Sequence, residues 1–224
     1  MNFFDKKTVL TIEVRDMKKY LILLLLVLTI PVFSITTTPD YLSTKNFQKE
    51  STSGGNFVAD AISNAVDCDI VFVGTCDLKE LKLKSTTPTD EEVVGLLSKK
   101  ESKIGCITLT GEQLYQVLNK AVSIYPKNNP AFLQVSGLNL TFNPGKKGGD
   151  KIVKLKINGK DLDREGSYKV AMSSDLGAGA FGYWKIWEPK NFEKTEVSME
   201  KAVTDYLAKD PIKNFFLKRI IVGE

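Results

Sequence analysis

The sequence predicts an α+β domain in which helices pack on a mixed β-sheet. Three observations support this class. In the first half, apolar residues recur with helical spacing in separate segments. After Pro130 the pattern changes to short runs rich in β-branched and aromatic residues. The chain then closes on one more helix and one more strand. Because the strands gather in the second half, a doubly wound parallel sheet is disfavoured.

Three helices are predicted before Pro130. The first begins at Gly54 with Ser53 as its N-cap. Its apolar face is formed by Phe57, Ala61, Ile62 and Ala65. A second helix is predicted over 89–97, and Thr110 caps a third that begins at 111. The apolar face of the third helix is formed by Leu114, Val117, Leu118 and Ala121.

Seven segments have the composition of strands. They are residues 69–73, 104–109, 132–135, 138–142, 152–157, 168–172 and 219–222. Asn158-Gly159 is a strong signal for a hairpin turn. A last helix is expected over 198–208, and Asp210-Pro211 is expected to end it.

The N-terminal segment has the layout of a secretory signal peptide, about Met17–Ser34. Its apolar run over 20–33 follows two lysines and is too short to span a bilayer. We therefore expect a secreted or periplasmic protein without a stable membrane span after cleavage; the alternative is an N-terminally anchored protein. Met17 is the better start, so residues 1–16 are expected not to be translated. Residues 35–52 are expected to form a leader, and 53–224 the domain.

The 224 residues contain no histidine. Histidine is the commonest general base near neutral pH and the commonest metal ligand, so a Ser-His-Asp triad or a histidine-bearing metal site is excluded. No cofactor is expected. Lysine and arginine exceed aspartate and glutamate by 31 − 27 = 4 residues. That excess is spread along the chain, so a nucleic-acid partner is not expected.

Three cysteines follow the predicted export signal: Cys68, Cys76 and Cys106. One must remain unpaired within the chain. They form neither a CxxC motif nor a zinc-binding spacing. Two interpretations remain open, a small disulfide or three buried free thiols.

Five short segments carry a family resemblance. They read Gly-Asn-Phe-Val-Ala-Asp-Ala at 55–61, Asp-Ile-Val-Phe-Val at 69–73, Leu-Thr-Gly-Glu-Gln-Leu at 109–114, Leu-Gln-Val-Ser-Gly-Leu at 133–138, and Asp-Tyr-Leu at 205–207 followed by Pro211-Ile212 and Arg219-Ile220. In this order they resemble the C-terminal domain of bacterial 5'-nucleotidases and UDP-sugar hydrolases, from about Thr52 to Ile220. The resemblance implies the fold of that domain. It also implies a nucleotide or nucleoside-like ligand, and a partnership with a metallophosphatase domain that these residues do not supply.

The resemblance also implies where a ligand would bind. After the central strand the family has Asn-Gly-Gly-Gly-Ile-Arg, whereas residues 74–79 read Gly-Thr-Cys-Asp-Leu-Lys. Lys79 keeps the positive charge of the arginine but loses its planar fork. Asp77 puts a negative charge where an anion would lie.

Two further loops depart from the family pattern. The family has Pro-Phe-Gly-Asn where residues 99–102 read Lys-Lys-Glu-Ser, so a stacking ring is lost and Ser102 takes the last position. It has Asn-Asp-Phe and Gly-Gly-Asp-Gly-Tyr where this chain has Ser-Asp-Leu at 174–176 and Gly-Ala-Phe-Gly-Tyr at 179–183. By position, the ligand-binding residues would be Lys79, Asp77, Ser102, Asp175, Phe181 and Tyr183. Losing two rings would weaken a nucleoside site by about two to four orders of magnitude.

Three functions follow from these observations. The first is a secreted, non-catalytic module that binds another ligand or partner through a degenerate nucleotide pocket. The second is the substrate-binding subunit of a split 5'-nucleotidase whose metallophosphatase domain is on another chain. The third is an enzyme acting alone through carboxylates or a thiolate such as Cys76. Phe181, Tyr183 and Trp184 would form a new aromatic platform, or they are plain core and surface residues.

Overall fold

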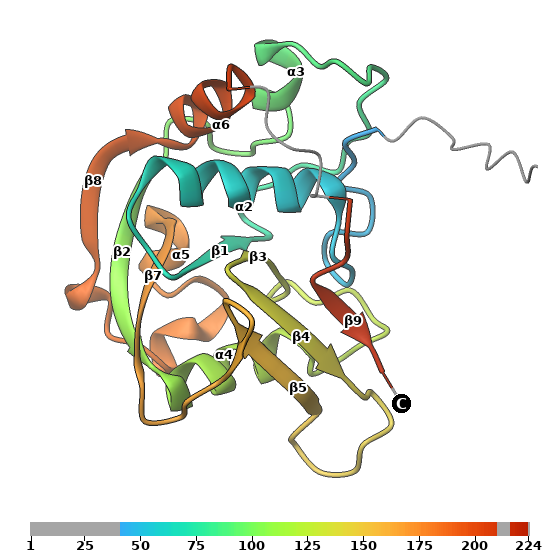
Figure 1. Cartoon of the computed structure of the whole chain (residues 1–224), viewed down its shortest axis with the longest axis vertical. Coiled ribbons are helices and arrows are strands. Elements are labelled where there is room, and N and C mark those ends of the chain that lie inside the picture. The colour runs from blue at the N-terminus through green and yellow to red at the C-terminus, as the bar shows by residue number, and fades with distance from the viewer. Residues whose placement is uncertain (1–40, 210–215, 224) are drawn as a thin grey trace, which may run out of the picture. The chain divides into compact units, whose positions relative to one another are not determined.

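The structure, a computed structural model, describes residues 41–209 and 216–223 (Figure 1). Its helices are α2 (Ser53–Ala65), α3 (Asp90–Val94), α4 (Gly111–Val122), α5 (Ser174–Gly177) and α6 (Met199–Leu207), with the 3-10 helices η1 (Ala180–Lys185) and η2 (Pro189–Asn191). Its strands are β1 (Ile70–Gly74), β2 (Lys103–Thr110), β3 (Leu133–Ser136), β4 (Leu138–Phe142), β5 (Ile152–Ile157), β6 (Lys160–Asp161), β7 (Ser167–Ser173), β8 (Glu193–Ser198) and β9 (Ile220–Val222). All seven predicted strands are therefore present.

The α+β class is confirmed, but the strands form two mixed sheets and not one. The five-stranded sheet has the order β3-β1-β7-β2-β8, with β1 and β7 parallel. The four-stranded sheet has the order β6-β5-β4-β9, with β4 and β9 parallel. The chain passes from one sheet to the other at Gly137, whose φ is +79°. A Cβ atom there would lie 2.1 Å from the carbonyl oxygen of Asp69, so only glycine fits this corner.

Two apolar cores lie on opposite faces of the five-stranded sheet. Side chains alternate along a strand, and β1 is buried throughout. Its Ile70 and Phe72 join the core formed with α4 and the four-stranded sheet. Its Val71 and Val73 join the core formed with α2 and α6. Figure 1 accordingly shows α2 and α6 on one side of the sheet and α4 on the other.

Helix caps mostly follow the sequence signals. Thr110 is the N-cap of α4, as the sequence predicts, and it forms a reciprocal capping box with Gln113. The N-cap of α2 is Thr52, and the prediction of Ser53 is wrong. The Ser53 hydroxyl instead accepts a hydrogen bond from the Ser43 N–H and donates one to the Tyr41 carbonyl.

The other differences have local causes. The helix predicted over 89–97 ends at Val94, because the following residues turn and Leu97 forms an isolated β-bridge with Leu78. The hairpin turn is confirmed, since Asn158 and Gly159 both have positive φ angles. The predicted stop at Asp210-Pro211 lies outside the described residues.

The described part of the expected leader, residues 41–52, belongs to the domain. Leu42 and Phe47 are buried in the α2 core. The Thr44 hydroxyl donates a hydrogen bond of 2.5 Å to the Lys79 carbonyl, which ties this segment to the loop after β1. Residues 41–52, which the sequence assigns to a leader, therefore pack with the residues after 52. The sequence does not show which residues Leu42 and Phe47 contact.

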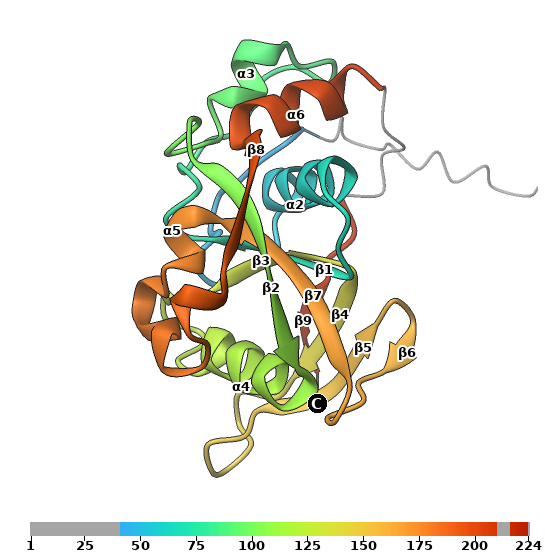
Figure 2. The ribbon, with the colours of Figure 1, turned by 90° about the vertical axis from the view of Figure 1, so that its left-hand side faces the viewer.

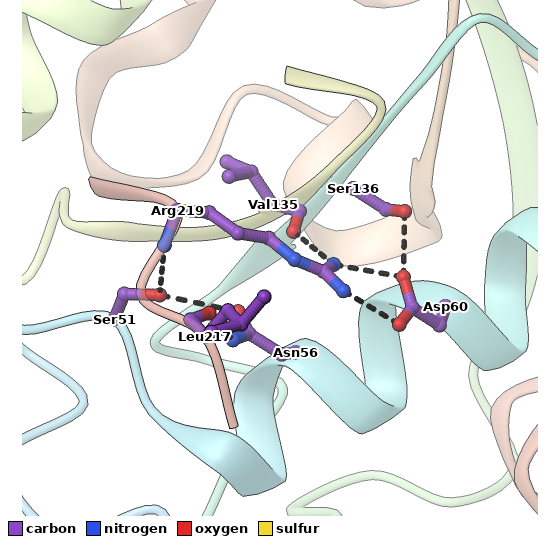
Figure 3. Close-up of polar contacts among 7 residues, drawn as sticks. All are labelled: Ser51, Asn56, Asp60, Val135, Ser136, Leu217 and Arg219. Carbon is purple, nitrogen blue, oxygen red and sulfur yellow. Dashed lines mark hydrogen bonds and ion pairs between the residues drawn. The ribbon is translucent and has the colours of Figure 1, made fainter. Parts of the chain in front are cut away.

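A polar clamp fastens β9 to α2 and β3 (Figure 3). The Arg219 guanidinium donates to both carboxylate oxygens of Asp60, at 2.8 and 2.6 Å, and to the Val135 carbonyl at 2.7 Å. The Ser136 hydroxyl donates to the same carboxylate at 2.7 Å. The two charged side chains are only 12% and 14% exposed. The motif residues at 60, 136 and 219 thus hold the fold together.

Gln134 connects the motif at 133–138 with the motif at 55–61. Its amide oxygen accepts the Thr52 N–H at 2.8 Å, and its amide nitrogen donates to the carbonyls of Phe47 and Glu50. A Cβ atom at Gly55 would lie 2.4 Å from the Gln134 side chain. The Gly-Asn motif of α2 therefore makes room for the glutamine of β3.

Residues 1–40, which include the predicted signal peptide, lie outside the described residues. Within the described ranges, no helix has the length and apolar character needed to cross a membrane.

Candidate functional site

Three loops meet at one edge of the five-stranded sheet. Because β1 and β7 are parallel, the loop after Gly74 and the helix α5 after Ser173 leave the sheet at the same edge. Because β2 is antiparallel to β7, the segment 99–102 enters the sheet there too. The start of β3 joins them, and the Thr75 hydroxyl hydrogen-bonds the Pro130 carbonyl. The segments in which the resemblance places a ligand are thus neighbours in space.

Asp77 is turned into the protein at this edge. Its side chain is buried, with the residue 2% exposed. One carboxylate oxygen accepts the Gly74 N–H at 2.7 Å, and the other lies 3.6 Å from the Cys76 sulfur. The Ser173 side chain also hydrogen-bonds this carboxylate. Burial raises the pKa of Asp77 to about 6, although these hydrogen bonds oppose the rise.

Lys99 and Asp175 form the exposed ionic pair of the edge. Their side chains lie 2.9 Å apart, and the hydrogen bond to Asp175 raises the pKa of Lys99. Sequence reasoning did not select Lys99 as a site residue. Lys99 lies in the segment 99–102 that was compared with the family, but only the fold brings its side chain to α5.

Ser102 and Lys79 contribute mainly through their backbones. The Ser102 carbonyl accepts the Met199 N–H at 2.9 Å, which joins this loop to the start of α6. The Lys79 N–H donates to the Leu96 carbonyl at 2.9 Å. Its side chain is exposed and makes no hydrogen bond or ion pair with the described residues. Lys79 is therefore available to a ligand or a partner.

The aromatic residues of η1 separate into two groups. Tyr183 is fully buried, donates its hydroxyl to the Ala131 carbonyl at 2.5 Å, and stacks on Trp187 with ring centroids 5.0 Å apart. The ring of Tyr183, which the resemblance places at the ligand site, thus packs in the core. Phe181 is 38% exposed and Trp184 is 60% exposed. Phe181 has a φ of +55°, a strained conformation for a residue with a side chain.

The cysteines are all free thiols, so the predicted alternative of a disulfide is not present. Each is half-buried and none is fully enclosed. Burial raises the pKa of the Cys68 thiol to about 11. Burial and the neighbouring Asp77 raise the pKa of Cys76 further still. A thiol in this environment is a poor nucleophile, because the thiolate is the reactive form.

We expect the three thiols to react slowly with iodoacetamide at pH 8 in the folded protein, with Cys76 slowest. Neutralising the adjacent carboxylate in Asp77→Asn should accelerate labelling of Cys76 and leave Cys68 unchanged. Mass spectrometry of timed digests measures each rate. Faster labelling of Cys76 than of a cysteine-containing model peptide would contradict the raised pKa of its thiol.

A metal centre does not fit this edge. Within the described ranges, no group of three or more aspartate, glutamate, cysteine or histidine side chains could hold a metal ion. Each acidic residue here has a separate partner. Asp77 accepts the Gly74 N–H, and Asp175 pairs with Lys99.

Comparison with known proteins agrees with the resemblance. The family model for the 5'-nucleotidase C-terminal domain matches residues 33–186. The chain belongs to this family. A 5'-nucleotidase-related protein of Glossina morsitans morsitans is 31% identical over 99 residues, which cover 39% of this chain and 18% of that protein.

Solved structures show the same fold for this 5'-nucleotidase C-terminal domain. The 5'-nucleotidase precursor of Thermus thermophilus aligns with a TM-score of 0.71 and 20% identity, over 89% of this chain and 42% of that one. The NAD nucleotidase of Haemophilus influenzae aligns with a TM-score of 0.66 and 16% identity, over 78% of this chain and 34% of that one. The chain thus spans less than half of these relatives.

Proposed function

We propose that this domain is a non-catalytic ligand-binding module. In it, the Asp77 carboxylate occupies the position in loop 74–79 where the phosphate of a ligand would bind. One observation carries the proposal: Asp77 accepts the Gly74 N–H at 2.7 Å. A backbone N–H at a strand end is the group that a glycine-rich loop offers to an anion. Here that N–H, of Gly74, already binds the Asp77 carboxylate.

The chemistry of the remaining groups supports binding and not hydrolysis. A hydrolase needs a nucleophile or a general base whose proton affinity suits neutral pH. Asp77 has a suitable pKa of about 6, but it is buried and accepts the Gly74 N–H, so its carboxylate does not face a substrate. The raised pKa of Cys76 keeps its thiol protonated. Asp175 is held by Lys99. Lys79, Lys99 and Phe181 remain exposed at the loops, where a small molecule or a protein could contact them.

Calorimetric titration with adenosine, AMP and UDP-glucose tests this function. We expect AMP to bind no more tightly than adenosine. Asp77→Gly should release the Gly74 N–H and raise AMP affinity about tenfold, since a charge-assisted hydrogen bond is regained. Asp77→Asn retains an acceptor and should gain less, and Glu101→Gln on the same edge is the matched control. Hydrolysis of AMP by the pure protein with Mg²⁺, Mn²⁺ or Zn²⁺ would overturn the proposal.

A second function, the substrate-binding subunit of a split 5'-nucleotidase, is supported by the two exposed lysines at the edge. Lys79 has no side-chain partner among the described residues, and a second protein that carries a metallophosphatase domain could supply one. Co-expression with such a protein should give a complex that hydrolyses nucleotides faster than the partner alone. If no complex forms and the rate is unchanged, this function is excluded.

We further propose that the protein is exported, on the basis of the basic and apolar pattern over 17–34. Amino-terminal sequencing of the protein recovered from its host should then begin near residue 35. A protein that retains the apolar run would instead favour the N-terminal anchor.

A further inference from the structure

The outer edge of β2 is only half covered. β7 pairs with β2 from Ile104 to Thr110. β8 pairs with β2 only at Lys103, Gly105 and Cys106, and Figure 2 shows β8 and β2 diverging. No other strand of the described chain lies beside this edge. Four residues of β2 therefore lack a neighbour on the β8 side.

Phe192 accounts for the divergence. Its ring fills the space that Cβ atoms at Gly105 and Gly177 would take, since both would lie 2.6 Å from it. The chain before Phe192 is coiled into η2, where the Asn191 N–H donates to the Glu188 carbonyl at 3.0 Å. If the register that pairs Cys106 with Glu193 continued, Asn191 would lie opposite Thr108. It is instead committed to η2.

Thr108 presents its backbone groups to this open edge. Its partner in β7 is Lys169. The N–H and the carbonyl of Lys169 both bind Asp69, so they point away from β2, to the β1 side of β7. In an antiparallel pair such directions alternate. Ile107 and Leu109 therefore bond with β7, and the N–H and C=O of Thr108 point away from it. Neither group has a partner in the described structure.

Two hollows flank Thr108 on opposite faces of the sheet. One, of about 720 Å³, includes Ile107, Leu109, Trp184 and Trp187 in its wall. The other, of about 240 Å³, includes Cys106, Thr108 and Lys169. Ile107, Thr108 and Asn191 line both hollows, whereas Leu109 lines only the large one and Cys106 only the small one. An added strand would place successive side chains alternately into the large and the small hollow.

The charges at this edge favour an uncharged occupant. The large hollow has one lysine and one glutamate in its wall, Lys185 and Glu188, and the small one has Lys169 and Glu193. The exposed indole of Trp184 offers a flat apolar surface to a side chain. Neither hollow has the positive excess that a phosphate would need.

We propose that the Thr108 edge docks a short, uncharged, extended segment of a partner protein, which adds antiparallel to β2 by main-chain hydrogen bonds. The segment places a small side chain opposite Thr108 and apolar side chains on either side of it, against Trp184. Trp184 shares the helix η1 with Phe181 of the proposed ligand site, but Thr108 lies outside the loops of that site. A variant of Thr108 therefore tests this proposal without touching the other.

The probe is the peptide acetyl-Thr-Phe-Ser-Val-Thr-amide, titrated into the ¹⁵N-labelled protein. We expect the Thr108 amide to shift and to gain protection from hydrogen exchange. N-methylation of the central serine removes the donor to the Thr108 carbonyl and should weaken binding about fivefold or more. Trp184→Ala should weaken it about tenfold, and Ile124→Ala, an exposed apolar residue elsewhere, should have no effect.

A variant of Thr108 gives an independent test. Thr108→Pro removes only the N–H that faces outward, so the bonds between β2 and β7 remain and the protein should fold with an unchanged circular dichroism spectrum. Peptide binding should be lost. A Thr108 amide that does not move, or equal binding of the N-methylated peptide, would overturn the proposal. So would a protein dimer broken by Thr108→Pro, because the occupant would then be a second copy.

Discussion

Asp60→Ala should lower the free energy of unfolding by about 3–5 kcal/mol, because it leaves the Arg219 guanidinium buried without its carboxylate. Arg219 is 12% exposed and donates three hydrogen bonds, two to Asp60 and one to the Val135 carbonyl. Arg219→Ala should cost a similar amount, since Asp60 would keep only the Ser136 hydroxyl. Urea unfolding followed by circular dichroism measures both changes.

The double variant and a surface pair serve as controls. In the Asp60→Ala/Arg219→Ala protein the loss should be much smaller than the sum of the single losses, because no unpaired charge remains. The pair Lys201–Asp205 is also 2.8 Å apart, but its side chains are 63% and 53% exposed. Asp205→Ala should therefore cost no more than about 0.5 kcal/mol. If Asp60→Ala costs as little as Asp205→Ala, the clamp does not stabilise the fold.

Local signals in the sequence were enough for most elements. The strand β1 is a run of apolar, β-rich residues that ends at a glycine, and its two faces are both buried. Thr110 predicted the start of α4, because its side chain caps a backbone N–H only three residues further on. Asn158-Gly159 predicted a hairpin because few other residues adopt two successive positive φ angles.

Features that depend on distant contacts were not predicted. The division into two sheets occurs at Gly137, whose close approach to Asp69 has no signature in either segment. Asp60 and Arg219 are 159 positions apart, and their pairing could not be inferred from motif order. Tyr183 was assigned to the ligand site by alignment, yet the local chain turns it into the core.

Asp77 shows the same limit at the candidate site. Its charge and its position after β1 are plain in the sequence and predict a carboxylate that faces an incoming anion. The structure turns this side chain inward, where its nearest donor is the Gly74 N–H. The difference arises because burial of a loop residue is set by its neighbours, here by Ser173 of β7, which hydrogen-bonds the Asp77 carboxylate.

The buried carboxyl of Asp77 should make stability depend on pH. Its folded-state pKa is about 6, above the ordinary value of 3.8. A carboxyl with a raised folded-state pKa binds its proton more tightly in the folded protein, so its stabilising contribution is complete below about pH 3.8 and is lost as the pH rises through about 6. At pH 8 the ionised group should cost about 3 kcal/mol relative to its protonated form.

Asp77→Asn isolates this contribution from those of other carboxyl groups. Asparagine keeps an acceptor for the Gly74 N–H but cannot ionise. The variant should match the unsubstituted protein near pH 4 and exceed its free energy of unfolding by up to about 3 kcal/mol at pH 8. Asp175→Asn, on the same edge but paired with Lys99, should show no such gain. Urea unfolding at each pH measures the difference. If it does not change between pH 4 and 8, or if the ¹³C resonance of the Asp77 carboxyl titrates near pH 4, the buried carboxylate is not strained. The loop after β1 would then hold the Asp77 carboxylate at no cost, and the hydrogen bond from the Gly74 N–H would fully offset its burial.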